Sequence, residues 1–217
     1  MNTEREYKGL ITEAEYKKLI KKYDPYAFET EQVYRPQKPD KSESDLSTKD
    51  LFRSSHHINR YFDTNDFDLF HNGCSLRIRD AKDGFTMTLK SKNISSKAFL
   101  SDRDEYNKEI SGEQHREYLK AGIEAAQLWG ILKGVAGGKQ LRHMGTLWTT
   151  RHRIKFSDNL FLEMDKSYYE GITDYEIEFE YEDEKELNML HDYLNSNGIY
   201  PRCGSGKFSR FIEKLHS

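Results

Sequence analysis

Apolar and charged residues alternate along several stretches of the chain, most strictly over residues 174–182. There Tyr175, Ile177, Phe179 and Tyr181 alternate with glutamates. Successive side chains of a β-strand point to opposite faces of a sheet. The segment therefore predicts a strand with one apolar face and one acidic face.

The same period of two predicts further strands, each with a charged face. These expected strands span residues 57–64, 74–80, 85–92, 100–110 and 160–166, and residues 141–156 are expected to form a hairpin. Their polar faces carry Arg77, Arg79, Lys90, Arg151, Arg153, Glu163 and Asp165. An antiparallel sheet wetted on its outer side would explain such faces without any function.

Between these strands a period of 3.6 residues predicts helices. Thr12 and Glu15 have the spacing of a capping box, so the first helix should begin there and run to about Tyr23. Further helices are expected over residues 123–133, 183–197 and 208–215, another after Ser111, and a short helix or loop over residues 66–71.

Residues 29–55 are polar and contain Pro36 and Pro39, which predicts a strand followed by a long loop. We interpret residues 35–55 as a tolerated insertion, with a lid as the alternative. The sequence contains no repeat or low-complexity tract, so we expect one domain over residues 1–217.

Composition narrows the possible partners. Lys and Arg total 34 against 37 Asp and Glu, a net charge of -3, so no global field draws the chain to nucleic acid or to an anionic membrane. No apolar run approaches the roughly 20 residues that span a bilayer, and a signal peptide is not apparent, which predicts a cytoplasmic protein. Cys74 and Cys203 form no CxxC or Cys/His cluster, so we expect reduced thiols.

The first candidate site is residues 4–8. In an extended strand Glu4, Glu6 and Lys8 would share one face, about 7 Å apart from one to the next. Such a row could bind a divalent cation through its acids and a phosphate through its amine. A solvated edge strand, or the first turn of a charged helix, remains the alternative for this stretch alone.

The density of charge favours an enclosed site. Glu176, Glu178 and Glu180 follow one another on one strand face with no lysine between them. Carboxylates at that density are stabilised by a bound cation or by facing bases. A barrel with a charged interior would provide both.

The ordered motifs resemble those of the CYTH superfamily, the triphosphate tunnel metalloenzymes. Glu4, Glu6 and Lys8 match its ExExK signature, and the resemblance covers nearly the whole chain. It continues in the family's order through residues 61–64, 76–79, 88–90, 151–153, 163–165, 176–180 and 205–207.

The resemblance implies an α+β fold, an eight-stranded antiparallel barrel that forms a tunnel, with helices packed outside. It implies that cationic side chains bind the phosphate oxygens: Lys8, Arg77, Arg79, Lys90, Arg153 and Lys207, with Arg151 and Arg210 as weaker candidates. Glu4 and Glu6 would bind Mg²⁺ or Mn²⁺, and Glu176, Glu178 and possibly Asp165 a second ion. Glu4, Glu6, Lys8, Lys90 and Glu178 are the expected catalytic residues, and Glu105 is a looser candidate for the tunnel.

The function that the resemblance implies is metal-dependent hydrolysis of inorganic triphosphate or a small organic triphosphate. A class IV adenylate cyclase, which would form cyclic AMP from ATP in the same tunnel, is the nearest alternative, and a non-catalytic sensor of polyphosphate or nucleotide is another. We expect a small-molecule triphosphate as the binding partner, and a monomer or homodimer.

Overall fold

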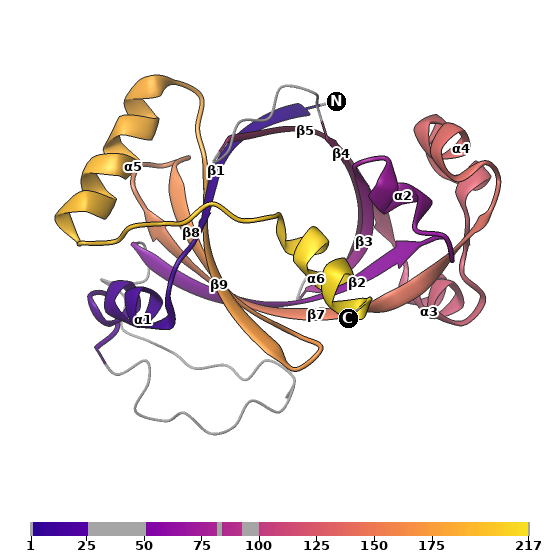
Figure 1. The fold of residues 1–217 in the computed structure, drawn as a ribbon, viewed down its shortest axis with the longest axis horizontal. Coiled ribbons are helices and arrows are strands. Elements are labelled where there is room, and N and C mark those ends of the chain that lie inside the picture. The colour runs from indigo at the N-terminus through magenta and orange to yellow at the C-terminus, as the bar shows by residue number, and fades with distance from the viewer. Residues whose placement is uncertain (1, 26–50, 82–83, 93–99, 217) are drawn as a thin grey trace.

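The computed structural model describes residues 2–25, 51–81, 84–92 and 100–216, except for the side chains of residues 2–4, 81, 92, 100–103 and 127 (Figure 1). The sequence's long polar segment therefore lies outside the described residues, apart from its last part. Residues 52–55, which we expected in a loop, belong to a strand.

Eight antiparallel strands close into a barrel (Figure 1). They are β1 (Asn2–Leu10), β2 (Phe52–Asp63), β3 (Cys74–Ala81), β4 (Gly84–Lys92), β5 (Leu100–Ile110), β7 (Gln140–Lys155), β8 (Phe161–Tyr169) and β9 (Ile172–Glu180). Their order is β2-β3-β4-β5-β1-β9-β8-β7, and β7 pairs with β2 to close the ring. The short strand β6 (Ile123–Glu124) extends the sheet at one end of β7. The predicted eight-stranded antiparallel barrel is confirmed.

Two sequence predictions about elements were wrong. The hairpin expected over residues 141–156 is the single 16-residue strand β7. It stays extended because β2, which begins at Phe52, pairs with it along most of its length, with one shift of register between Tyr61 and Phe62. The helix expected over residues 123–133 is divided into β6, the 3₁₀ turn η1 (Ala125–Gln127) and α4 (Gly130–Ala136), because Ile123 pairs with Leu141 of β7.

The helices cover the outside of the barrel, where the apolar faces of the strands lie. Helices α1 (Glu13–Lys21) and α5 (Glu184–Ser196) pack on one side, with Leu19 and Leu190 in the cluster that contains Leu162 and Phe179. The capping box predicted at Thr12 and Glu15 is confirmed. On the other side lie α2 (Asp68–His71), α3 (Gly112–Ala121) and α4 (Figure 1). They cover a second apolar cluster, which includes Phe62, Leu76, Ile78, Met87 and Leu89. With their apolar faces outward, the strands turn their charged faces inward.

The last helix, α6 (Lys207–Leu215), is the exception because it lies across one end of the barrel (Figure 1). Its Phe208, Phe211 and Ile212 form a third apolar cluster with Tyr61, Leu147 and Tyr169 of the barrel strands. The approach is close at Gly145, where an added Cβ would lie 2.7 Å from Cζ of Phe211. The helix therefore brings its first residue, Lys207, to the barrel interior. Among the described helices, none combines the length and apolar character needed to cross a membrane.

We expect Gly145→Ala to destabilise the protein by about 1–3 kcal/mol, the usual cost of overpacking a filled core. The new methyl group would displace the fully buried ring of Phe211. Urea unfolding of the variant checks this expectation. Gly134→Ala is the control, since nothing lies within 4 Å of its added Cβ and alanine is the better helix former. Equal stability of the two variants would contradict the close packing of α6.

Candidate active site

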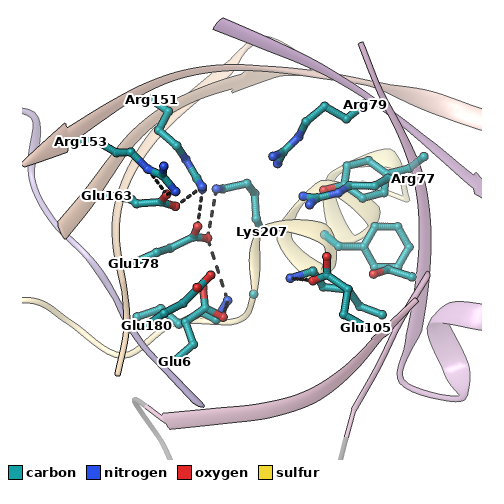
Figure 2. Close-up of a pocket in the computed structure, with 16 residues that line it drawn as sticks. Glu6, Arg77, Arg79, Glu105, Arg151, Arg153, Glu163, Glu178, Glu180 and Lys207 are labelled. Carbon is teal, nitrogen blue, oxygen red and sulfur yellow. Dashed lines mark hydrogen bonds and ion pairs between the residues drawn. The ribbon is translucent and has the colours of Figure 1, made fainter. Parts of the chain in front are cut away.

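A cavity of about 230 Å³ lies within the barrel, and charged side chains form most of its wall (Figure 2). Seven cationic residues and five glutamates line it, so the formal charge of the wall is positive. The lining residues are Glu6, Lys8, Tyr61, Ser75, Arg77, Arg79, Lys90, Glu105, Arg151, Arg153, Glu163, Glu178, Glu180, Gly206, Lys207 and Phe208. Cavities with this polarity suit a compact anion with several charges.

Acidic residues face each other in pairs on one wall, formed by β1, β9 and β8. The strand registers place Glu6 opposite Glu180, and Glu178 opposite Glu163. A third pair, Glu176 and Asp165, lies one step further along β9 and β8. Like charges directly opposite each other destabilise a sheet, so this wall requires cations.

Arg151 supplies one of those cations. Its Nε donates to Oδ1 of Asp165 at 2.8 Å and its Nη2 to Oδ2 at 2.7 Å, and it also pairs with Glu163 and Glu178. Two parallel bonds of this kind fix a guanidinium in one orientation. Arg151 therefore joins three carboxylates from two strands.

Lys207 supplies a second cation from the beginning of α6. Its Nζ lies 2.5 Å from Oδ2 of Asp165, 3.3 Å from Oε1 of Glu178 and 3.5 Å from Oε1 of Glu176. Burial alone would raise the pKa of the fully buried Asp165, but Arg151 and Lys207 lower it to about 2. Burial likewise opposes ionisation of Glu178, yet Lys207, Arg151 and Lys8 hold its pKa well below the ordinary value. Both carboxylates are ionised at neutral pH.

Glu176 occupies a drier position behind the cavity wall. It is 2% exposed, and its Oε2 accepts from Nη1 of Arg210 at 2.8 Å, while Nε of Arg210 donates to Asp174 at 2.7 Å. Burial raises the pKa of Glu176 to about 7, against the opposing effect of Lys207. Glu176 of β9 thus contacts two residues of α6, Lys207 and Arg210.

The opposite wall carries Arg77 and Arg79 of β3, which point into the cavity (Figure 2). Within the described part of the chain, neither forms an ion pair with a carboxylate. Nε of Arg79 donates to Oδ1 of Asn59 at 3.0 Å, whereas the buried Nε of Arg77 has no acceptor there. Burial, together with Arg77 and Arg151, lowers the pKa of Arg79 to about 9. Among the described residues, these two guanidiniums therefore have no carboxylate within ion-pair distance.

Comparison with known protein families places this cavity in context. The model of the CYTH domain matches residues 34–212 of the chain. The chain belongs to the CYTH domain family. The match begins after Glu4, Glu6 and Lys8. The assignment of these three residues to the site therefore depends on the ExExK motif and on their position in β1.

Solved structures share this CYTH fold along nearly the whole chain. A candidate adenylate cyclase from Bacillus halodurans is 27% identical over 95% of this chain and 96% of that one, with a TM-score of 0.66. A Hippeastrum protein, described as a candidate adenylyl cyclase with a dominant triphosphatase activity, is 22% identical over 97% and 95% of the two chains, with a TM-score of 0.69. A Pyrococcus horikoshii protein is 16% identical over 97% and 99%, with a TM-score of 0.58. No curated protein matches the chain.

The CYTH barrel brings most of the predicted site residues to one cavity. Those that line it are Glu6, Lys8, Arg77, Arg79, Lys90, Arg151, Arg153, Glu178 and Lys207. Asp165, Glu176 and Arg210 do not line it, because they belong to the ion-pair network behind its wall, where the two acids are buried. Glu4 lies on β1 opposite Arg103, and its side chain is outside the described residues.

Several lining residues were not among the predicted site residues. Glu163 and Glu180 share the charged strand faces of the predicted acids, so the alternation alone could have identified them. Glu105, the looser candidate, does line the cavity. Tyr61 and Phe208 line it because α6 packs against β2, a tertiary contact that no local pattern indicates.

The donor chemistry of the acidic wall fits a hard divalent cation. Carboxylate oxygens from adjacent strands are the ligands that Mg²⁺ and Mn²⁺ prefer. Glu6 and Glu180 face each other directly, and Lys8 Nζ, at 2.6 Å from Glu6, provides one positive charge beside them. In the part of the chain with described side chains, which excludes Glu4, no three acidic, His or Cys residues converge as a ready ligand set.

Proposed function

We propose that this CYTH protein hydrolyses the terminal phosphate of inorganic triphosphate or of a small organic triphosphate, with Mg²⁺ or Mn²⁺ as the cofactor. The observation that carries the proposal is the pair Arg77 and Arg79, two guanidiniums that form no ion pair with any described carboxylate and that face an acidic wall across one cavity. An anion with several charges would bind to the wall that carries Arg77 and Arg79, and cations would bind to the acidic wall. A metal-bound chain of phosphates supplies both.

In this proposal the cations of the cavity bind and align the substrate. Arg77, Arg79 and Lys90 donate to the phosphate oxygens on one side, and Lys8 and Arg153 donate on the other. Arg153 is half exposed and shares Glu163 with Arg151, so it can turn toward an anion at the cavity mouth. Arginine binds phosphate oxygens through two donors at once, which fixes the orientation of each phosphate.

The reaction is an in-line displacement at the terminal phosphorus. The oxygen of water forms a bond to that phosphorus, the bond to the bridging oxygen breaks, and its electron pair stays on the diphosphate product. The proton of the attacking water passes to solvent or to a phosphate oxygen. Cations around the phosphates offset the charge that develops during this step.

The proposed metal ligands are Glu4, Glu6 and Glu178. A bound divalent cation would neutralise phosphate charge and help to ionise the attacking water. Asp165 and Glu176, proposed from the family resemblance as ligands of a second ion, already bind Arg151, Lys207 and Arg210. We assign these two acids to positioning the cations, and we assign Arg210 to holding α6.

Lys8 serves as a binding group in this scheme. Its Nζ lies 2.6 Å from Glu6 and 4.0 Å from Glu178. Carboxylates at these distances favour the charged form of lysine. A protonated Lys8 donates to a phosphate oxygen, and it cannot act as a general base.

The second candidate is an adenylate cyclase, which the similarity to the candidate cyclase from Bacillus halodurans favours. In that reaction the ribose hydroxyl attacks the α-phosphorus of ATP and diphosphate leaves. The products separate the two functions, because a triphosphatase releases orthophosphate, whereas a cyclase forms cyclic AMP and diphosphate.

A phosphate-release panel tests the proposal. Tripolyphosphate, thiamine triphosphate and ATP are each offered with Mg²⁺ and with Mn²⁺, and the products are identified. We expect orthophosphate from at least one substrate. Formation of cyclic AMP without orthophosphate would replace the proposal by its alternative, and tight binding without turnover would indicate a sensor.

Arg77→Gln tests the role of the unpaired guanidiniums. We expect it to weaken the binding of tripolyphosphate about 10- to 100-fold, the range of one or two hydrogen bonds to a charged group. Titration calorimetry with Mg²⁺ present measures the affinity. Arg142→Gln is the matched control, because it removes the same charge from an exposed position outside the cavity. Equal affinities of the two variants would contradict the assignment.

A further inference from the structure

Two hydrogen bonds and one ion pair connect four residues on the inner faces of β4 and β5. Oγ1 of Thr88 donates to Oδ1 of Asn107 at 2.7 Å, and Nδ2 of Asn107 donates to Oε1 of Glu105 at 2.8 Å. The other oxygen of Glu105 lies 2.5 Å from Nζ of Lys90. The strand register explains the arrangement, since Thr88 is directly opposite Asn107 and Lys90 is directly opposite Glu105.

The four linked residues lead from the barrel wall to the cavity. Thr88 is 3% exposed and does not line the cavity, and Asn107 does not line it either. Glu105 and Lys90 do line it, with side-chain exposures of 11% and 21%. A buried hydroxyl therefore connects, through one amide and one carboxylate, to an ammonium group that faces the proposed substrate.

Each link constrains the next one. The hydroxyl of Thr88 occupies the oxygen of the Asn107 amide, so the NH₂ group faces Glu105. With one oxygen held by Asn107, Glu105 presents its other oxygen to Lys90. Burial alone would raise the pKa of Glu105, but Lys90 and the hydrogen bond from Asn107 lower it to about 2. The carboxylate is thus charged and fixed at both oxygens.

The position of these four linked residues in the cavity wall indicates what they do. Lys207 and Arg151, across the cavity, are each held by several carboxylates. Arg77 and Arg79, beside Lys90, have no carboxylate partner within the described residues. A lysine side chain has four rotatable carbon bonds and gains precision only when its ammonium is held. Glu105 can hold it, provided that Glu105 is itself held.

We propose that Thr88 and Asn107 are positioning residues that fix Glu105 so that it directs Lys90 at the bound phosphates. This inference rests on the proposed function, because it assigns a substrate to Lys90. Neither residue touches the phosphates, and both act through the carboxylate of Glu105.

Thr88→Val and Thr88→Ser form a matched pair that tests the inference. Valine keeps the shape of the side chain and loses the hydroxyl donor, whereas serine keeps the donor and loses a methyl group. We expect Thr88→Val to raise KM for tripolyphosphate about 3- to 10-fold, the effect of one hydrogen bond, while kcat changes less than about 2-fold. Thr88→Ser should restore KM to nearly the wild-type value.

A double variant separates positioning from a general structural effect. If Thr88 acts through Lys90, then Thr88→Val should change KM no further once Lys90→Met is present. An additive effect in that background would overturn the inference. Should Thr88→Val fail to fold, Asn107→Ala carries the same test at an exposed position.

Failure of the positioning role can be distinguished from failure of the proposed function. Wild-type protein that hydrolyses tripolyphosphate while Thr88→Val and Asn107→Ala retain its KM overturns the positioning role and leaves the proposed function intact. Wild-type protein that neither binds nor hydrolyses any triphosphate overturns both.

Discussion

Replacement of Glu178 by glutamine is expected to lower the rate of phosphate release from tripolyphosphate at least ~10²-fold, the scale of damage to a catalytic metal site. Glu178 contacts Arg151 and Lys207 and lies 4.0 Å from Lys8, so its charge holds three cations at once. Glutamine keeps the size of the side chain but removes the charge that these cations and a divalent ion require. Initial rates at saturating substrate and metal measure the effect.

Glu182→Gln is the matched control for this experiment. Glu182 continues the alternation of β9 by two residues, but it is exposed and does not line the cavity. We expect this variant to retain the wild-type rate. A loss of less than about threefold in Glu178→Gln, with folding intact, would remove Glu178 from the catalytic site.

The largest expected effect on stability is that of Asp165→Asn, about 3–5 kcal/mol, the usual cost when one member of a buried ion pair is removed. Asp165 is 0% exposed, and its carboxylate joins Arg151 to Lys207. Without it, both cations lose one of the two carboxylates that they share, the other being Glu178. Urea unfolding at pH 7 measures the change in free energy of unfolding.

A double variant and a pH series sharpen this test. Asp165→Asn combined with Lys207→Met should be more stable than the single variant, because it removes a buried positive charge that Asp165 no longer offsets. The folded pKa of Asp165, about 2, lies below its unfolded value of about 3.9, so its contribution is complete above pH 4 and is lost as the pH falls toward 2. The difference from wild type should shrink over that window. Asp158→Asn, at an exposed residue, should leave the unfolding midpoint unchanged.

The alternation of residue types was enough to predict which side chains share the charged face of each strand. Arg77, Arg79, Lys90 and Glu178 were placed on charged strand faces from sequence, and all four line the cavity. Their pattern has a period of two, and that period is a direct consequence of strand geometry. The family resemblance added the closure of those strands into a barrel.

The alternation could not predict which of the inward-facing acids line the cavity and which lie behind its wall. Asp165 and Glu176 have the same period as Glu163 and Glu178, yet the first two lie behind the wall of the cavity. The difference arises because α6 enters one end of the barrel and covers those positions with Lys207 and Arg210. Tertiary contacts of this kind leave no mark on the local pattern of the strands.

Element boundaries failed where long-range pairing decides them. Nothing local to β7 indicates that it stays extended for 16 residues, since its partner β2 is distant in sequence. Ile123 is apolar in a helical pattern, but its pairing with Leu141 draws it into the sheet. In both cases a strand partner outweighed local propensity.

The two larger apolar clusters of this protein lie outside the barrel, between strands and helices, and the third lies under α6 at one end, while charged residues form most of the lining. Hydrophobic stabilisation scales with the apolar area removed from water, so it arises in the outer layer and not in the lining. Exposed lining residues such as Arg153 could then be exchanged in a library without dismantling the molecule. The barrel offers a starting scaffold for directed evolution toward other polyanions, provided that the buried acids behind its wall are left in place.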